Sequence, residues 1–202
     1  MTLVTISAAY GAGGSRIAPA VAERLGVPFL GRPAVPELFD DAEADACREG
    51  AGSGGGLLSR LTSMAVAWGT PAGLTAEELL PDQARRHELE TEIRAFAEGG
   101  EGVILGRGAV VVLHDDPRVL HVLLDGTVDA RTRQAMVIED IDRATAHHRL
   151  VRVDRFRRAY LEDLYGVRVH EPGVFHLVLD STVLALGECV ELIAVAARAH
   201  AR

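Results

Sequence analysis

The segment from Leu3 to Ala18, LVTISAAYGAGGSRIA, places a glycine-rich turn between an apolar stretch and a helix-like stretch. Backbone N–H groups of such a turn, together with a helix N-terminus, can bind a phosphate group. If the phosphate-loop frame G-x-x-x-x-G-K-[ST] is aligned with Gly13 as its second glycine, Ala8 takes the first glycine position, Gly14 the lysine position and Ser15 the hydroxyl position. Two of four fixed positions match, so the turn alone predicts either a phosphate-binding loop or an ordinary glycine turn.

The chain contains no lysine at any position, because all 21 basic residues are arginine. Arginine is a planar, permanently charged fork that suits phosphate oxygens. An arginine from another segment can therefore replace the lysine that Gly14 lacks. Ser15 has two interpretations, a hydroxyl that binds a metal ion and a residue at a helix N-terminus with no metal to bind.

A second group of candidate residues lies between Ala146 and Tyr165, in the stretch HHRLVRVDRFRRAYLEDL. Its arginines are Arg149, Arg152, Arg155, Arg157 and Arg158. With about 100° per residue, a helix here gathers its apolar side chains on one face. That face comprises Val153, Phe156, Tyr160 and Leu164. Arg149 and Arg157 fall in the same sector, and a buried cation needs a partner, so we expect them to meet either a ligand phosphate or an internal carboxylate.

The elements that must position these residues alternate between strands and helices. The expected strands are 3–7, 27–30, 102–105, 118–125 and 174–180. The expected helices follow the glycine turn, lie near 35–47 and 82–98, begin near 128, and close the chain at 188–199. This alternation predicts an α/β fold with three layers, in which helices cover both faces of a five-stranded parallel sheet.

Ligands of such sheets bind at the carboxyl ends of the strands. Those ends carry the glycine turn, Gly106-Arg107-Gly108, Asp125-Gly126 and Asp180-Ser181-Thr182. The stretch 31–81 gives a weak signal, and its glycine cluster at 49–58 is either a surface linker or part of a lobe that closes over an acceptor.

The composition fits one domain over residues 1–202, with 48% hydrophobic residues. A net charge of −8 argues against nucleic acid or an anionic membrane surface as a partner. No apolar run approaches the length of about 18 residues that spans a bilayer. Cys47 and Cys189 are far apart and fit reduced thiols. We therefore expect a cytoplasmic protein, and the sequence leaves its oligomeric state open.

Three stretches resemble the bacterial cytidylate kinases, in particular the cytidylate-kinase-like branch. VILGRGAVVVLHDDPRVLHVLLDGTVDAR, at 103–131, is similar to the family's strand, Gly-Arg turn, short helix, strand and arginine-bearing helix. HLVLDSTVLALGECVELI, at 176–193, resembles its closing strand, Asp-Ser-Thr turn and last helix. ISAAYGAGGSRIA resembles the branch's variant loop without lysine. The likeness covers both ends of the chain, and 31–81 matches poorly.

The resemblance implies a nucleoside monophosphate kinase fold with ATP and Mg²⁺ as cofactors, a mobile acceptor-binding region at 31–81 and an arginine-rich lid at 138–166. The implied donor-phosphate residues are Gly11, Ala12, Gly13, Gly14, Ser15 and Arg16, with Ser15 on the metal. Arg131 is implied on the donor side, and Arg149 and Arg157 as lid arginines. Arg107 is implied to clamp the acceptor phosphate, and Asp125 matches the aspartate that ends the fourth strand.

Two departures from the family pattern affect the function. Gly14 removes the lysine, and Gly31 stands where the branch often has an aspartate. Arg32 is either an acceptor contact or an ordinary surface arginine. The first hypothesis is transfer of the γ-phosphoryl group of ATP to CMP or dCMP. Its alternatives are a kinase of another small acceptor and a nucleotide-binding protein without turnover.

The histidines do not suggest a catalyst. His114, His121, His170 and His176 are interpreted as core or surface residues. The adjacent His147 and His148 would face different directions on a helix, which argues against a shared metal ion.

Overall fold

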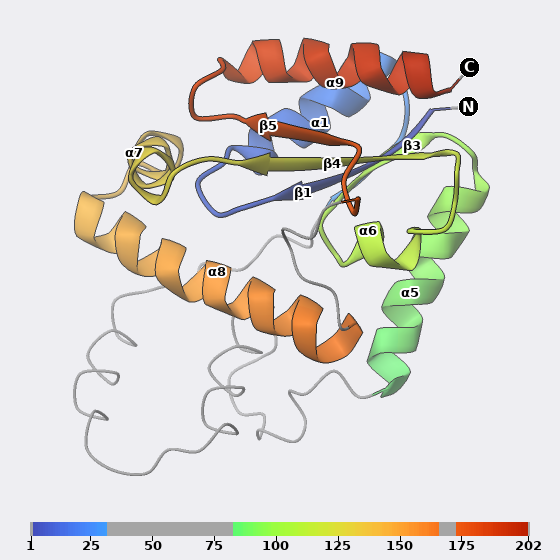
Figure 1. Cartoon of the computed structure of the whole chain (residues 1–202), viewed down its shortest axis with the longest axis horizontal. Coiled ribbons are helices and arrows are strands. Elements are labelled where there is room, and N and C mark those ends of the chain that lie inside the picture. Colours follow the sequence, from blue (N-terminus) through green and yellow to red (C-terminus); the bar gives the residue numbers. More distant parts are fainter. Residues whose placement is uncertain (1, 32–82, 166–172, 202) are drawn as a thin grey trace. The chain divides into compact units, whose positions relative to one another are not determined.

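The computed structural model describes residues 2–31, 83–165 and 173–201, without the side chains of 83–86 and 156–165 (Figure 1). The chain divides into two compact units, one formed by Met1–Gly31 with Glu90–Arg202 and the other by Arg32–Leu89. All described strands lie in the first unit, and residues 83–89 are the described part of the second. The single domain expected over 1–202 stays a prediction, and the helix expected near 35–47 lies outside the described residues.

The first unit contains a five-stranded sheet in the order β2-β3-β1-β4-β5, and every neighbouring pair is parallel. The strands are β1 (Leu3–Ala8), β2 (Phe29–Leu30), β3 (Gly102–Leu105), β4 (Val119–Asp125) and β5 (Leu177–Asp180). The central strands β1, β3 and β4 are almost entirely buried, as expected for strands covered on both faces. The predicted α/β fold with a five-stranded parallel sheet is confirmed.

Helices cover both faces of this sheet (Figure 1). On one face, α1 (Gly14–Leu25) and α9 (Leu186–His200) pack on residues such as Val4 and Ile6. On the other face, α5 (Gln83–Glu98) and the short α6 (Ala109–Val112) pack on Leu3 and Ile104. Side chains alternate between the two faces along each strand, so β1 contributes to both cores.

Two further helices follow β4. Helix α7 (Val128–Glu139) begins after Thr127, whose hydroxyl accepts a hydrogen bond from the backbone N–H of Ala130. Helix α8 (Arg143–Tyr165) begins after Asp142, whose Oδ1 accepts from the N–H groups of Ala144 and Thr145. The hydroxyl of Thr145 donates to the same carboxylate and is the main cause of the lowered pKa of Asp142. Helix α8 carries the arginines predicted for the lid.

A ladder of stacked histidine rings lies in the same unit, and His121 of β4 is its buried member at 1% exposure. The ring of His121 stacks on His114 at 6.4 Å and on His176 at 5.1 Å, and His176 stacks on His200 at 5.4 Å. A 2.7 Å hydrogen bond joins His121 Nδ1 to Thr5 Oγ1. Burial, helped by the charges of His176 and His114, lowers the pKa of His121 to about 4.

Protonation of His121 should therefore destabilise the fold. Its pKa is near 6.5 in the unfolded chain, so the unfolded state takes up the proton first as the pH falls. As the pH falls from 6.5 to 4, this group should lower the free energy of unfolding by about 1.4 kcal/mol for each pH unit. In urea unfolding at pH 7.0, 5.5 and 4.5, His121→Asn should lose stability less steeply than the wild type. His148→Asn, at an exposed position, is the control, and equal slopes for wild type and H121N would contradict the expectation.

Candidate functional site

The glycine turn lies between β1 and α1, at the carboxyl edge of the sheet. Gly11 and Gly13 have left-handed backbones, with φ values of +77° and +72°. Alternation of left-handed residues with ordinary ones forms a concave set of N–H groups that suits an anion. Gly13 caps α1 without a side-chain hydrogen bond, so the first N–H groups of this 12-residue helix also face the loop without a side-chain cap. Ser15 and Arg16 are exposed on the first turn of α1.

A close contact disfavours any side chain at position 14. A Cβ atom added to Gly14 would lie 2.4 Å from the Cβ atom of Ala8, far inside normal contact distance. Ala8 and Gly14 are the two positions at which the loop departs from the phosphate-loop frame. The two departures are therefore physically coupled, because the methyl group of Ala8 fills the space that any side chain at position 14 would enter.

This contact predicts that the effect of Gly14→Ala on stability changes sign when residue 8 is changed as well. Gly14→Ala would stabilise an ordinary helix by up to about 1 kcal/mol, but here the clash should make it destabilising by about 1–3 kcal/mol. Ala8→Gly should remove the clash, so that Gly14→Ala becomes neutral or stabilising in the Ala8→Gly background. Urea unfolding of the two single variants and the double variant measures this coupling. Additive effects would show that Ala8 does not restrict position 14.

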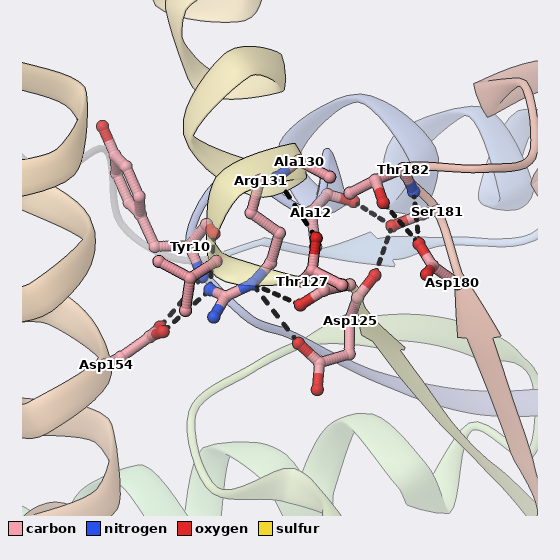
Figure 2. Close-up of polar contacts among 12 residues, drawn as sticks. Tyr10, Ala12, Asp125, Thr127, Ala130, Arg131, Asp154, Asp180, Ser181 and Thr182 are labelled. Atoms are coloured by element: carbon pink, nitrogen blue, oxygen red, sulfur yellow. Dashed lines mark hydrogen bonds and ion pairs between the residues drawn. The ribbon is translucent and has the colours of Figure 1, made fainter. Parts of the chain in front are cut away.

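Side chains from distant elements hold the loop at its carbonyl groups (Figure 2). The buried hydroxyl of Ser181, after β5, donates to the carbonyl of Ala12 at 2.7 Å. The guanidinium of Arg131, in α7, donates to the carbonyl of Tyr10 at 2.9 Å. The N–H of Ala9 donates to the carbonyl of Leu124 at 2.9 Å. The loop is thus fixed by the ends of two strands and by α7.

Arg131 is the most buried of the site's arginines whose side chains the structure describes, with a side chain 7% exposed. Its Nε donates to the carbonyl of Gly126 at 2.9 Å, and its Nη1 donates to Asp154 Oδ2 at 2.7 Å. Asp125 Oδ1 lies 3.4 Å from its Nε. Two carboxylates and two carbonyls therefore compensate the buried charge. The structure places Arg131 beside the loop, and its contact with a nucleotide stays a prediction.

Tyr10 joins the loop to α7 and α8 through all of its polar groups. Its N–H donates to Asp154 Oδ1 at 3.3 Å, and its carbonyl accepts from Arg131. Its ring extends away from that guanidinium (Figure 2), and its hydroxyl donates to Glu139 Oε2 at 2.7 Å. Arg149 Nη1 donates to the same Oε2 at 3.0 Å. An internal carboxylate, one of the two partners that the sequence left open for Arg149, is thus present.

Arg107 occupies a separate part of the sheet edge, in a strained turn. Its φ of +58° is left-handed, as are those of its neighbours Gly106 and Gly108, and such backbones are uncommon for a residue with a side chain. Its Nε donates to the carbonyl of Gly31 at 2.8 Å, and its Nη1 donates to Glu92 Oε2 at 2.5 Å. Arg107 therefore links the end of β2 to α5, and its contact with an acceptor phosphate stays a prediction.

Some predicted residues lie outside what the structure describes. These are Arg32, the acceptor-binding region from 32 onward and the side chain of Arg157. The predicted lid, 138–166, corresponds to the end of α7, the turn after it and α8, and its movement stays a prediction.

Sequence reasoning missed three residues of this site, Tyr10, Glu139 and Asp154. It placed Ser181 at the carboxyl edge of the sheet but gave it no role toward the loop. Asp154 is the one acidic residue within the arginine-rich run 146–158, a signal that could have marked it as an arginine partner. Tyr10 and Glu139 carry no such signal, because they are 129 positions apart and meet only in the fold.

A parallel sheet in the order 2-3-1-4-5, with a glycine loop between β1 and α1, defines a P-loop kinase fold. The model of the Cytidylate kinase-like family matches residues 3–183. The chain therefore belongs to the cytidylate kinase-like family. Among curated proteins, none matches this chain in sequence. In the part of the chain that the structure describes, no helix is long and apolar enough to cross a membrane.

Solved structures show the same fold. An uncharacterized protein from Eubacterium ventriosum is 18% identical, with a TM-score of 0.68 over 98% of this chain and 99% of its own. A sugar kinase from Janibacter sp. HTCC2649 is 18% identical, with a TM-score of 0.52 over 96% of this chain and 93% of its own. A gluconokinase from Sinorhizobium meliloti 1021 is 15% identical, with a TM-score of 0.50 over 99% and 93%.

Proposed function

We propose that this protein is an ATP-dependent phosphotransferase that transfers the γ-phosphoryl group of ATP to CMP or dCMP. The observation that carries the proposal is the loop itself, in which two left-handed glycines precede an uncapped helix N-terminus at the carboxyl edge of a parallel sheet. Membership of the cytidylate kinase-like family supports the nucleotide as substrate. We place the reaction in the cytoplasm, with small-molecule nucleotides as the partners.

The donor phosphates are assigned to the loop from Gly11 to Ser15 and to the first turn of α1. The N–H groups there can donate to phosphate oxygens, as at other helix N-termini. The hydroxyl of Ser15 is exposed and suited to the Mg²⁺ ion that accompanies ATP. Arg16 is exposed beside it, and Arg131 supports the loop at the carbonyl of Tyr10.

The acceptor phosphate is assigned to the other part of the sheet edge, around Arg107, and the acceptor nucleoside to Asp125 beside Arg131. Arg107 would bind the acceptor phosphate, and Arg32 would join it from the region after β2. Asp125, at the end of β4 with its side chain 26% exposed, would contact the acceptor nucleoside. A phosphate reaching Arg107 must compete with Glu92, whose side chain is 49% exposed and therefore free to hydrate.

Catalysis then consists mainly of alignment and charge neutralisation. Phosphoryl transfer demands little covalent chemistry of the protein, but two phosphate-bearing substrates repel each other. Mg²⁺ and the lid arginines Arg149 and Arg157 would screen this repulsion, and closure of 138–166 would exclude water. Arginine would thereby replace the lysine that the Ala8 methyl group excludes at Gly14.

The test is a transfer assay with ATP and Mg²⁺ over a panel of CMP, dCMP, UMP, AMP and GMP. The variant Arg149→Ala, Arg157→Ala should lose about 100-fold or more in kcat, since each arginine neutralises charge that develops during transfer. The matched control is Arg152→Ala, Arg155→Ala, which removes the same charge from the same helix outside the inward sector. That control should stay within about threefold of the wild type.

A second candidate is a kinase of another small acceptor, favoured by the glycine at position 31 and by the fold shared with a sugar kinase and a gluconokinase. Gluconate and simple sugars therefore belong in the same panel. Transfer to one of these, with none to a nucleotide, would replace the first proposal by the second. ATP binding without transfer to any acceptor would instead indicate a nucleotide-binding protein without turnover.

A further inference from the structure

Glu139, at the end of α7, holds two donors on one carboxylate oxygen. Its Oε2 accepts from the Tyr10 hydroxyl at 2.7 Å and from Arg149 Nη1 at 3.0 Å. The side chains of Arg149 and Glu139 are 23% and 33% exposed, so the pair is partly open to water. One donor comes from the phosphate loop and the other from the helix of the lid arginines. Glu139 is thus a carboxylate beside the loop, and it is paired with Arg149, which we assign to phosphate binding.

We propose that Glu139 is a positioning residue that holds Arg149 beside the loop in the nucleotide-free protein and exchanges it for the donor phosphates when they bind. This inference rests on the function proposed above. A phosphate chain offers several charged oxygens to the guanidinium fork, whereas Glu139 offers one oxygen that it already shares. We therefore expect Arg149 to bind the donor phosphates more strongly than it binds Glu139.

The rest of α8 need not leave the loop for this exchange. Asp154, on the same helix, accepts from the Tyr10 N–H and from Arg131. Those two contacts do not involve Arg149, so α8 can keep them while the Arg149 side chain turns from carboxylate to phosphate.

The hydroxyl of Tyr10 lowers the free-energy cost of moving Arg149 from Glu139 to a phosphate. When Arg149 leaves, the tyrosine hydroxyl still donates to Glu139, and water reaches the carboxylate. Burial and the neighbouring Glu139 carboxylate raise the pKa of Tyr10, so the hydroxyl remains a proton donor at neutral pH. Without this hydroxyl, Glu139 would depend more strongly on Arg149.

The arrangement predicts effects of opposite sign for two neighbouring substitutions. Glu139→Gln should weaken the attraction that holds Arg149 to Glu139 and tighten the binding of Mg·ATP and of inorganic triphosphate about threefold, the scale of a partly exposed ion pair. Tyr10→Phe should leave Arg149 more firmly held by Glu139 and weaken the binding of both, because the hydroxyl interacts more strongly with Glu139 than with Arg149. If Tyr10 and Glu139 were merely structural, both substitutions would weaken binding.

Asp129 provides the matched control. It lies on α7 like Glu139, and it pairs with Arg143 at the start of α8 and with Arg133. Asp129→Asn therefore removes one negative charge and one contact between α7 and α8, away from Tyr10. It should leave the affinities nearly unchanged.

The experiment is calorimetric titration of the full chain with Mg·ATP and with inorganic triphosphate. It compares the wild type, E139Q, Y10F, D129N, R149Q and the double variant E139Q/R149Q. The expected result is a gain in E139Q that exceeds any gain in D129N, disappears when R149Q is compared with E139Q/R149Q, and has the opposite sign to the effect of Y10F. An E139Q gain no larger than that of D129N, or one that persists without Arg149, would overturn the inference.

The outcomes separate this inference from the proposed function. Transfer activity with no specific effect of E139Q would overturn the role of Glu139 and leave the phosphotransferase standing. The expected binding pattern without transfer to any acceptor would support the role of Glu139 and overturn the phosphotransferase. If neither ligand binds the wild type, both are overturned.

Discussion

The buried guanidinium of Arg131 is the interaction on which the candidate site depends. A cation that is 7% exposed must find acceptors inside the protein. Arg131 finds them on the phosphate loop at Tyr10, on the turn after β4 at Gly126, and on α8 at Asp154. Satisfying one charge thus fixes where the loop, the sheet edge and α8 meet, and no other described side chain contacts all three in this way.

The parallel sheet makes this convergence possible. All five strands end at the same edge, so the loop after β1, the turn after β4 and the residues after β5 come together there. The loop needs that support, since Gly11 and Gly13 give it unusual backbone freedom. Ser181 and Arg131 bind its carbonyl groups, so this support does not use the N–H groups at the start of α1.

The sequence predicted the sheet and the loop because both depend on local patterns. Apolar runs ended at glycines or aspartates, and the helical spacing placed Arg149 toward the interior, where the structure finds it partly buried beside Glu139. The contacts of Tyr10 were not predictable, because its partners lie on α7 and α8. Asp125 and Asp154 both approach Arg131. The sequence could mark Asp154 as the partner of an arginine, but no spacing encodes that this arginine is Arg131. Features set by one segment, such as strands and the loop, could be predicted from the sequence. Contacts between segments far apart in the sequence could not.

The contact between Ala8 and Gly14 also limits how this loop can evolve. A lysine at position 14 would have its Cβ atom 2.4 Å from the Ala8 methyl group, so it could enter only with a shift of the backbone or of Ala8 and a loss of stability. The path to a loop with lysine that avoids this clash changes Ala8 to glycine first, and that change adds no phosphate contact on which selection could act. The methyl group of Ala8 thus limits which substitutions the loop can accept during evolution.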